Sequence, residues 1–594
     1  MNRLTDHWRL GCSLLFGLCV LLYWWLAYPA MTAYQEQYQL LLFDAGYLGG
    51  LFGVPGGVAR LVGEFLVQYG VSPLLGALAL AVVYVLVQRV AWRVMRGAAG
   101  VGETGELNSP AHYALSFVPA VLLWLLMGDE SVLMTFAVAL LAGLAAMWLY
   151  EWAGRQSVIH LIIYIMVCVP AVYWLAGPVV LMTAGYVLLR QLTVRPLSWG
   201  GVLAGLLAVA WAVACVVVSA WLVPYPVERL LQGLDYYRFV EVWCWPQTVV
   251  MLLCALLPVV VRWLPVPATV RRQRLVGLAE AGVLVVAFVA MQRVCYDDRK
   301  YEVMEYDYLV RQHNWDAIIA KAERKTPDLP MSVCATNLAL GMKGLLGERA
   351  FDFYQHGMQG LLPAFERNFS TILLTGEAYW QLGLVNTAQR FAFEAMEGIP
   401  NYHKSSRAVM RLAETNLVNG QYAVARKYLQ MLEKTLYYRR WARRLLPLLG
   451  NEQAISQHPV YGRLRQLRLT DDFLFSEQEL DKIMGQLLMH NHRNGLALQY
   501  LLLCPLLERD INKFMNYMTY VDGLRLGYRP RSCQEAIAFA FAQRRQQPPQ
   551  GYVSPLVLSQ FGEFARAYGA GGGQAASLSP FRHTTWYYLV GANN

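Results

Sequence analysis

The amino-terminal half of the chain alternates long apolar segments with short polar ones. Nine segments are almost free of charge: among their residues Glu280 is the only acid, and there is no lysine or arginine. Apolar segments close to about 20 residues long are typical of helices that cross a lipid bilayer. The pattern therefore predicts about nine transmembrane helices, over residues 10–27, 71–87, 113–127, 131–149, 158–174, 178–189, 200–223, 246–261 and 275–291.

Several of these segments are shorter than the roughly 20 residues that a helix needs to cross the membrane perpendicularly. Tilting, local thinning of the bilayer or partial penetration would accommodate them. The pair over 158–189 is broken at Gly177-Pro178 and could instead form a re-entrant hairpin. Either arrangement contributes an even number of passes, so the side on which the last helix emerges is the same.

The arginines give an independent indication of orientation. With the amino terminus inside the cell, twelve arginines fall in inner segments and four in outer ones, as the positive-inside rule predicts. The residues after 294 are then expected outside the cytoplasm, in the periplasm of a Gram-negative cell. The inner set is Arg3, Arg9, Arg89, Arg93, Arg96, Arg155, Arg190, Arg195, Arg262, Arg271, Arg272 and Arg274, and the outer set is Arg60, Arg229, Arg238 and Arg293.

The formal charge of +10 could suggest a nucleic-acid binder, but the distribution of charge argues against it. No continuous basic arm or nucleic-acid-binding motif is present, so nucleic acid is not an expected partner. The ten cysteines show no metal-ligand spacing. Five would face an oxidising compartment, where one disulfide is possible but the pair cannot be chosen from sequence: Cys244, Cys295, Cys334, Cys504 and Cys533.

The carboxyl-terminal half shows a different periodicity. From about Tyr301, apolar residues recur every three or four positions and turns recur every fifteen to twenty, which indicates helical hairpins. The segment Leu374–Pro400 fits the tetratricopeptide pattern best. We therefore expect an all-α protein with three parts: a transmembrane bundle over 1–294 with an amphipathic outer loop over 29–70, a periplasmic tetratricopeptide-like domain over 295–545, and an extension over 546–594 that docks on the helical domain.

The loop over 29–70 is too long to be only a connector. After Pro55-Gly56-Gly57, apolar residues recur at helical spacing, and Arg60, Glu64 and Gln68 form a polar stripe on the opposite face. Such a helix suits the membrane interface. The loop is either a structural plug on the bundle or a substrate site in which Glu36, Asp44 or Glu64 acts as a base or metal ligand.

Three further features could carry function. Glu280 lies one turn inside the last predicted helix, where a carboxylate needs a polar partner such as Arg274, or access to water. The loop 223–245 mixes charged and aromatic residues and suits an interfacial belt, a sugar or a lipid headgroup. Four arginines at 439–444 could bind an anion or form a solvated helix face. The candidate binding residues are Arg60, Tyr225, Glu228, Arg229, Arg238, Trp243, Arg439, Arg440, Arg443 and Arg444.

The arrangement resembles a family of multi-pass inner-membrane proteins of unknown function from the Bacteroides group. The residues that carry the resemblance are Pro55-Gly56-Gly57, Gly63-Glu64-Phe65-Leu66, the tetratricopeptide-like tail and Thr585-Trp586-Tyr587. This resemblance covers nearly the whole chain, but it implies no particular activity.

A looser resemblance is to membrane glycosyltransferases that use lipid-linked sugars. Those enzymes carry acidic residues in the first outer loop, and the corresponding positions here are Glu36, Asp44 and Glu64. The loop departs from their pattern because it has no adjacent acid pair and no D-x-D, and nine crossings are few for that group.

Three hypotheses follow. The chain is a membrane-anchored helical-repeat platform for protein or glycan partners in envelope assembly, a glycosyltransferase that uses a lipid-linked donor at the outer interface, or a transporter. No cofactor motif is present, although a transferase could need a divalent cation.

Overall fold

The computed structural model describes residues 2–98, 111–154, 157–194, 197–364, 369–470, 476–570 and 575–591. The predicted inner-side residues Arg155 and Arg195 lie outside these ranges. The described residues contain many helices and no strand, apart from one isolated antiparallel bridge between Val132 and Tyr237. The prediction of an all-α protein with apolar helices first and a helical region after them is confirmed.

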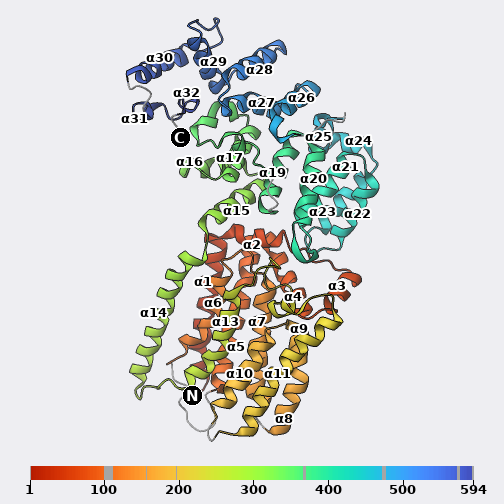
Figure 1. The fold of residues 1–594 in the computed structure, drawn as a ribbon, viewed down its shortest axis with the longest axis vertical. Helices are drawn as coiled ribbons and strands as arrows, with labels where there is room; N and C mark the ends of the chain where they lie inside the picture. The colour runs from red at the N-terminus through yellow and green to blue at the C-terminus, as the bar shows by residue number, and fades with distance from the viewer. Residues whose placement is uncertain are drawn as a thin grey trace. The chain divides into compact units, whose positions relative to one another are not determined.

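Contacts divide the chain into two compact units. Unit 1 contains residues 1–301 together with two short segments from far along the chain, 399–406 and 431–440. Unit 2 contains residues 302–398, 407–430 and 441–594. Figure 1 draws unit 1 mostly in red to yellow-green and unit 2 in green to blue.

Unit 1 holds seven helices that are long and apolar enough to cross a membrane, where sequence predicts about nine crossings. Their outward side chains are largely apolar, as expected for helices in contact with lipid. The α14 helix shows this most clearly, because none of its most apolar stretch is buried, and it stands at one side of unit 1 in Figure 1. The seven are His7–Ala27 (α1 and a π-turn), Pro73–Ala98 (α5), Met134–Ala153 (α7 and a π-turn), Val158–Ala176 (α8 and α9), Trp199–Leu222 (α11), Trp245–Arg262 (α13) and Val270–Cys295 (α14).

The other two predicted crossings are apolar helices that are too short to span a bilayer upright. They are Ala114–Leu126, which includes α6 (Val118–Leu126), and α10 (Val180–Leu192). At about 1.5 Å per residue, 13 residues cover roughly 20 Å of a hydrocarbon core about 30 Å thick. Both nevertheless run between the same two ends of unit 1 as the long helices do.

The two ends of unit 1 are recognisable from their hydrogen bonds. At the end that we call the α4 end, Gly56 N donates to Trp174 O (2.9 Å), and Leu133 N donates to Tyr236 O (3.1 Å). This end consists of residues 28–72, 128–133, 177–179 and 223–244. At the opposite end, Arg190 Nε lies 3.0 Å from Glu151 Oε1.

Short helices cover the α4 end: α2 (Pro29–Glu36), α3 (Ala45–Phe52), α4 (Gly57–Val67) and α12 (Val227–Gln232). Helix α4 packs closely on the first turn of α7 because Gly63 has no side chain. A Cβ at Gly63 would lie 2.7 Å from Thr135 N, and one at Gly56, where φ is +81°, would lie 3.5 Å from Gly177 Cα. The glycines of the Pro55-Gly56-Gly57 and Gly63 motifs therefore allow backbone-to-backbone packing at this end.

The amphipathic helix α4 turns its polar stripe toward the protein. Glu64 and Gln68 are buried, whereas Val62 on the apolar side is exposed. An amphipathic helix on a water-soluble protein buries its apolar face, whereas α4 buries its polar stripe. The orientation of α4 suits a helix whose apolar face meets lipid. The sequence predicts the amphipathic helix but not which partners its polar stripe would find.

Unit 2 consists of consecutive helices that pair as hairpins. The segment with the best tetratricopeptide match forms α19 (Phe369–Leu382) and α20 (Val385–Glu397), which turn at Gly383 with φ +93°. The remaining long helices are α15 (Asp298–Arg311), α16 (Trp315–Arg324), α17 (Pro330–Met342), α21 (Ser406–Val418), α22 (Tyr422–Glu433), α26 (Leu480–His490), α27 (Gly495–Leu507), α28 (Ile511–Gly523), α29 (Arg531–Gln543) and α30 (Pro555–Ala570). Five shorter helices are α18 (Leu346–Arg349), α23 (Arg439–Leu445), α24 (Glu452–Gln457), α25 (Tyr461–Leu467) and α31 (Ala575–Leu578).

The last helix, α32 (Thr585–Leu589), packs on α29 within unit 2. Trp586 is fully buried, and its Nε1 donates to Glu535 O (2.6 Å). The cysteines, all of which lie in the described ranges, are free thiols, and those of unit 2 are buried. The five cysteines considered for a disulfide therefore form none in this structure.

Candidate functional site

Two turns from far along the chain complete the α4 end of unit 1. The segment 399–406 joins α20 to α21, and the segment 431–440 joins α22 to α23. Backbone hydrogen bonds fix both to the loop over 28–72: Leu40 N donates to Lys404 O (3.1 Å), and Phe43 N donates to Lys434 O (2.7 Å). The α4 end is therefore built from the first outer loop predicted from sequence, the loop 223–244 and these two turns.

A buried ion network lies where these segments meet. Arg60 of α4 donates through Nε to Glu64 Oε1 (2.8 Å) and through Nη1 to Asp235 Oδ2 (3.0 Å). His403 lies between the same two carboxylates, with Nδ1 3.2 Å from Glu64 Oε1 and Nε2 2.9 Å from Asp235 Oδ1. The exposed fractions of these four side chains range from 0% for Glu64 to 12% for Arg60.

The surroundings of His403 favour its protonated, positively charged form. Ionised carboxylates can only accept hydrogen bonds, so a carboxylate beside each ring nitrogen favours a ring that donates from both, although Arg60 Nη2 also lies 3.5 Å from Nδ1. Burial and the nearby Arg60 charge lower the pKa of His403, but the hydrogen bonds to Asp235 and Glu64 outweigh them and raise it above its usual value. The two positive and two negative groups then balance.

The carboxylates stay ionised despite their burial. Burial would raise the pKa of Asp235, but the Arg60 charge and the hydrogen bonds from His403 and Asn401 hold it well below its usual range. The pKa of Glu64 is likewise lowered: burial opposes the charged form, and His403 and Arg60 overcome it. Tyr47 Oη donates a hydrogen bond to the second carboxylate oxygen of Glu64, Oε2, at 2.6 Å.

Asn401 extends the network toward α12. It occupies the left-handed region at φ +59°, which asparagine tolerates better than most residues. Its Nδ2 donates to Asp235 Oδ1 (3.0 Å) and Leu234 O (2.6 Å), and its Oδ1 accepts from Arg229 Nη2 at 2.8 Å. One asparagine side chain thus links the ion network to Arg229.

The three acids predicted as candidate catalytic residues occupy different surroundings. Glu36 is fully buried, and its Oε1 accepts from Tyr438 Oη (2.6 Å) and Ser406 Oγ (3.2 Å). Glu64 belongs to the ion network. Asp44 is partly exposed, caps α3 and pairs with Lys434 Nζ (2.6 Å), which lowers its pKa. Each acid is therefore held by an internal partner.

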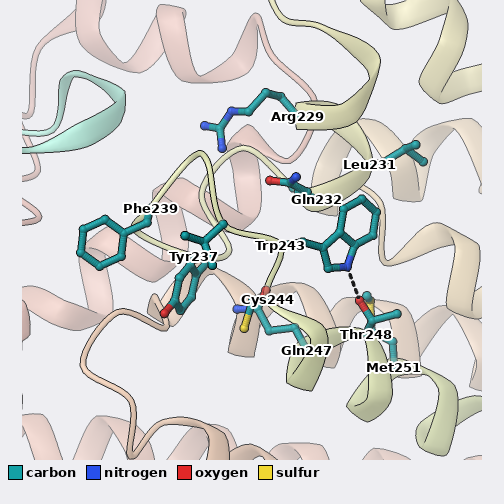
Figure 2. A pocket seen from close by; sticks show the side chains of 12 residues that line it. Arg229, Leu231, Gln232, Tyr237, Phe239, Trp243, Cys244, Gln247, Thr248 and Met251 are labelled. Atoms are coloured by element: carbon teal, nitrogen blue, oxygen red, sulfur yellow. Dashed lines mark hydrogen bonds between the residues drawn. The ribbon is translucent and has the colours of Figure 1, made fainter.

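A small pocket opens beside the network. It offers about 350 Å³ of empty space, part of it open to solvent. Figure 2 shows the rings of Tyr237 and Phe239 on one side and Trp243 on the other, with Trp243 Nε1 donating to Thr248 Oγ1 (3.1 Å). Its lining residues are Arg229, Leu231, Gln232, Gly233, Tyr237, Phe239, Val242, Trp243, Cys244, Gln247, Thr248 and Met251.

Of the binding residues predicted in the loop 223–245, Arg229 and Trp243 line this pocket. Arg238 is buried elsewhere, with its guanidinium 4.6 Å from the ring centroid of Tyr38. Glu228 is exposed and Tyr225 is half-buried, and neither lines the pocket.

The other predicted candidates lie away from the pocket. All four arginines of α23 — Arg439, Arg440, Arg443 and Arg444 — are exposed. Glu280 does find a polar partner, but it is His112 Nδ1 at 2.6 Å and not an arginine.

Sequence alone gave no reason to select His403, Asn401, Ser406 or Tyr438. His403 and Asn401 follow Pro400 in what the sequence presents as an ordinary turn between two hairpins. Only the packing of that turn in unit 1 brings them to Asp235. Within the described ranges, no group of three His, Cys, Asp or Glu side chains has the arrangement of a metal site.

The arrangement is suited to holding segments together and less suited to proton transfer on a substrate. A general base must reach the proton that it removes. Glu36 and Glu64 have no exposed surface, and their oxygens are occupied by tyrosine, serine, arginine and histidine donors. The exposed chemistry of this end is instead the pocket, with one guanidinium and three aromatic rings.

Comparison with known proteins identifies the family of the chain. Neither the curated proteins nor the solved structures contain a match. A family model described as a family of unknown function matches residues 6–592, which is almost the entire sequence. The protein is therefore an integral membrane protein that belongs to the family of unknown function DUF6057.

Proposed function

We propose that this protein is a membrane-anchored platform of the bacterial cell envelope. In this proposal the apolar helices hold it in the inner membrane, and the helical region of unit 2, a tetratricopeptide-like array, binds protein or glycan partners in the periplasm. Arrays of helical hairpins expose extended surfaces that suit such binding.

One observation carries the proposal. Glu36 and Glu64 of the loop 28–72 are buried, and both have partners from the two turns at 399–406 and 431–440. Charged groups in this position act to attach these two turns to the bundle. A platform needs such attachment, whereas a transferase needs carboxylates that reach a substrate.

The distribution of arginine supports the proposed orientation. Arg9 and Arg190 lie at the end opposite α4, and by the positive-inside rule that end faces the cytoplasm. Alkaline phosphatase fused after residue 300 should be active, because it folds only in the periplasm. A fluorescent protein that matures only in the cytosol should stay dark there, and a bright fusion would contradict the orientation.

Site-specific photo-cross-linking tests the platform itself. A photoreactive amino acid would replace exposed apolar residues of unit 2, namely Phe393, Val424 and Met489, in living cells. The proposal expects the same envelope partner to be cross-linked from more than one of these positions. The matched control is Leu278 on α14, which should capture none of that partner. Equal capture from Leu278 and from unit 2 would contradict a platform.

The pocket lined by Arg229 favours one second candidate, a transferase that uses a lipid-linked sugar. Aromatic rings next to a guanidinium suit a glycosyl phosphate. The purified protein would then transfer sugar from a polyprenyl-phosphate donor, and Arg229→Lys would lower the rate while Arg566→Lys on the exposed part of α30 would not. Absence of turnover with intact, folded protein would favour the platform.

A further inference from the structure

Arg229 is a half-buried cation without a counter-charge in contact. It lies on α12 and donates to Val240 O (3.1 Å), Leu234 O (3.4 Å) and Asn401 Oδ1 (2.8 Å). All three acceptors are neutral. Among the described residues, no carboxylate lies within 4 Å of its guanidinium nitrogens.

The nearest acid of the network, Asp235, favours the charged guanidinium through its own charge but is not in contact with it. Both oxygens of Asp235 are already occupied, by Arg60, His403 and Asn401. The charge of Asp235 therefore acts on the guanidinium of Arg229 only from a distance, and no carboxylate oxygen of the described residues accepts a hydrogen bond from Arg229. Glu228 and Glu241 are exposed to solvent, which screens their effect on the guanidinium.

Burial makes the charge of Arg229 costly. It lowers the pKa of the Arg229 guanidinium, which reports that the charged form has lost part of its hydration. Buried charges in proteins are usually paired. By comparison, Arg60, which is more deeply buried at the same end, has two carboxylates. An anion beside Arg229 would supply the missing pairing.

The pocket next to Arg229 has the composition of a lipid-headgroup site. Tyr237, Phe239 and Trp243 supply aromatic surface, and Gln232 and Thr248 supply polar groups (Figure 2). Its floor is the first turn of α13, a predicted crossing. Aromatic rings gather at the depth where lipid headgroups meet the hydrocarbon.

We propose that this pocket binds the phosphate of a membrane lipid headgroup, with Arg229 as the counter-charge. Trp243 and Phe239 would pack against the glycerol and the first methylene groups of the lipid, which enters from the leaflet at the α4 end. A guanidinium is the preferred partner of a phosphate because it offers several donors in one plane. The proposal does not depend on unit 2 acting as a platform.

The test uses the full-length protein purified in a neutral detergent. Three probes are added separately: phosphatidylglycerol, diacylglycerol with the same acyl chains, and inorganic phosphate. Native mass spectrometry measures binding, and the shift in thermal midpoint measures stabilisation. We expect phosphatidylglycerol to bind and stabilise, and the other two to do neither at the same concentration.

Variants locate the site. Arg229→Gln should weaken the binding of phosphatidylglycerol about tenfold or more, the scale of a charged hydrogen bond. Trp243→Ala should weaken it less, and Arg566→Gln, an exposed arginine of unit 2, should leave it unchanged. If Arg229→Gln does not fold, Arg229→Lys replaces it, because it keeps the charge but loses the planar fork, and it should bind measurably more weakly than the wild type.

Each other outcome overturns the proposal. Equal binding of diacylglycerol would show that the phosphate contributes nothing. Inorganic phosphate that binds as tightly as the lipid would remove the lipid from the proposal. Unchanged binding of phosphatidylglycerol to Arg229→Gln would place the lipid elsewhere on the protein. If Arg229→Gln does not fold, unchanged binding to both single variants, Arg229→Lys and Trp243→Ala, would lead to the same conclusion.

Discussion

Helices α4 and α23 carry charged side chains with the same spacing but in opposite environments. In α4, Arg60 and Glu64 are four residues apart and lie inside the protein with His403 and Asp235. In α23, Arg440 and Arg444 are also four residues apart, yet both are exposed. Both pairs share one helix face.

The difference teaches that spacing identifies a face but not what covers it. The α4 stripe is buried because the turn 399–406 and the loop 223–244 bring complementary charges to it. The α23 stripe contains only positive charges, which repel one another and are stable only where water hydrates them. Opposite signs within one stripe are thus compatible with burial, and equal signs favour exposure.

The largest expected effect is the loss of Arg60. Arg60→Met would leave Glu64 and Asp235 with only His403 between them, and removing one partner of a buried ion pair typically costs about 3–5 kcal/mol. We expect the thermal midpoint of the purified protein to fall sharply, and proteolysis at 399–406 to increase. A midpoint within one degree of the wild type would show that the network does not stabilise unit 1.

A second prediction concerns the close backbone contact between α4 and α7 at Gly63. A Cβ at Gly63 would lie 2.7 Å from Thr135 N and 2.9 Å from Thr135 Cα, atoms that cannot move aside easily. Gly63→Ala should therefore destabilise the protein by about 1–3 kcal/mol through overpacking. Gly49→Ala is the matched control, because nothing lies within 4 Å of a Cβ there. Similar midpoints for the two variants would contradict the close packing of α4 on α7.

The contribution of His403 to stability should depend on pH in the opposite sense to the contributions of Glu64 and Asp235. Because the pKa of His403 is raised in the folded state, its contribution is complete below the unfolded value of 6.5 and is lost as the pH rises through the folded value. The pKa values of Glu64 and Asp235 are lowered, so their contributions are complete above their unfolded values of 4.5 and 3.8 and are lost in acid. The network should therefore stabilise the folded protein most between about pH 4.5 and pH 6.5.

The difference in stability between the wild type and His403→Gln tests this sign. It should shrink as the pH rises above 6.5, with a slope of at most about 1.4 kcal/mol per pH unit for one proton. Thermal midpoints measured from pH 5 to 9 would show the trend. A difference that grows with rising pH would mean that His403 is neutral in the folded protein.

The smallest expected effect belongs to the exposed stripe. Arg440→Ala should change the free energy of unfolding by no more than about 0.5 kcal/mol, as is usual for surface substitutions. The measurement is the same thermal midpoint used for Arg60→Met. A large loss would show that α23 is covered, and the contrast between the two helices would disappear.

Local sequence patterns predicted much of the fold. The apolar segments located the crossings because lipid leaves little choice about which residues can face it. The two shortest segments could not be resolved in this way, since 13 residues fit a tilted helix or a partial one. The amphipathic pattern also located α4.

Only the site residues that lie in the first half of the chain could be predicted from sequence. Arg60, Glu64 and Arg229 stood out because charge is rare among the apolar residues of the first half. Their partners did not, because His403 and Asn401 come from a turn more than 160 residues after Asp235, as the separations of 168 and 166 residues show. Charged residues are common throughout the second half of the chain, so no single-sequence pattern distinguishes a turn that packs against the bundle from one in water.

The most direct test of the account is a double-mutant cycle between the bundle loop and the inserted turn. Asp235→Asn, His403→Gln and the combined variant would be compared with the wild type by the free energy of unfolding in detergent micelles. Because the side chains are in contact at 2.9 Å, we predict a coupling of about 1 kcal/mol or more. Effects that add to within about 0.3 kcal/mol would contradict the claim that this network fastens the turn to the bundle.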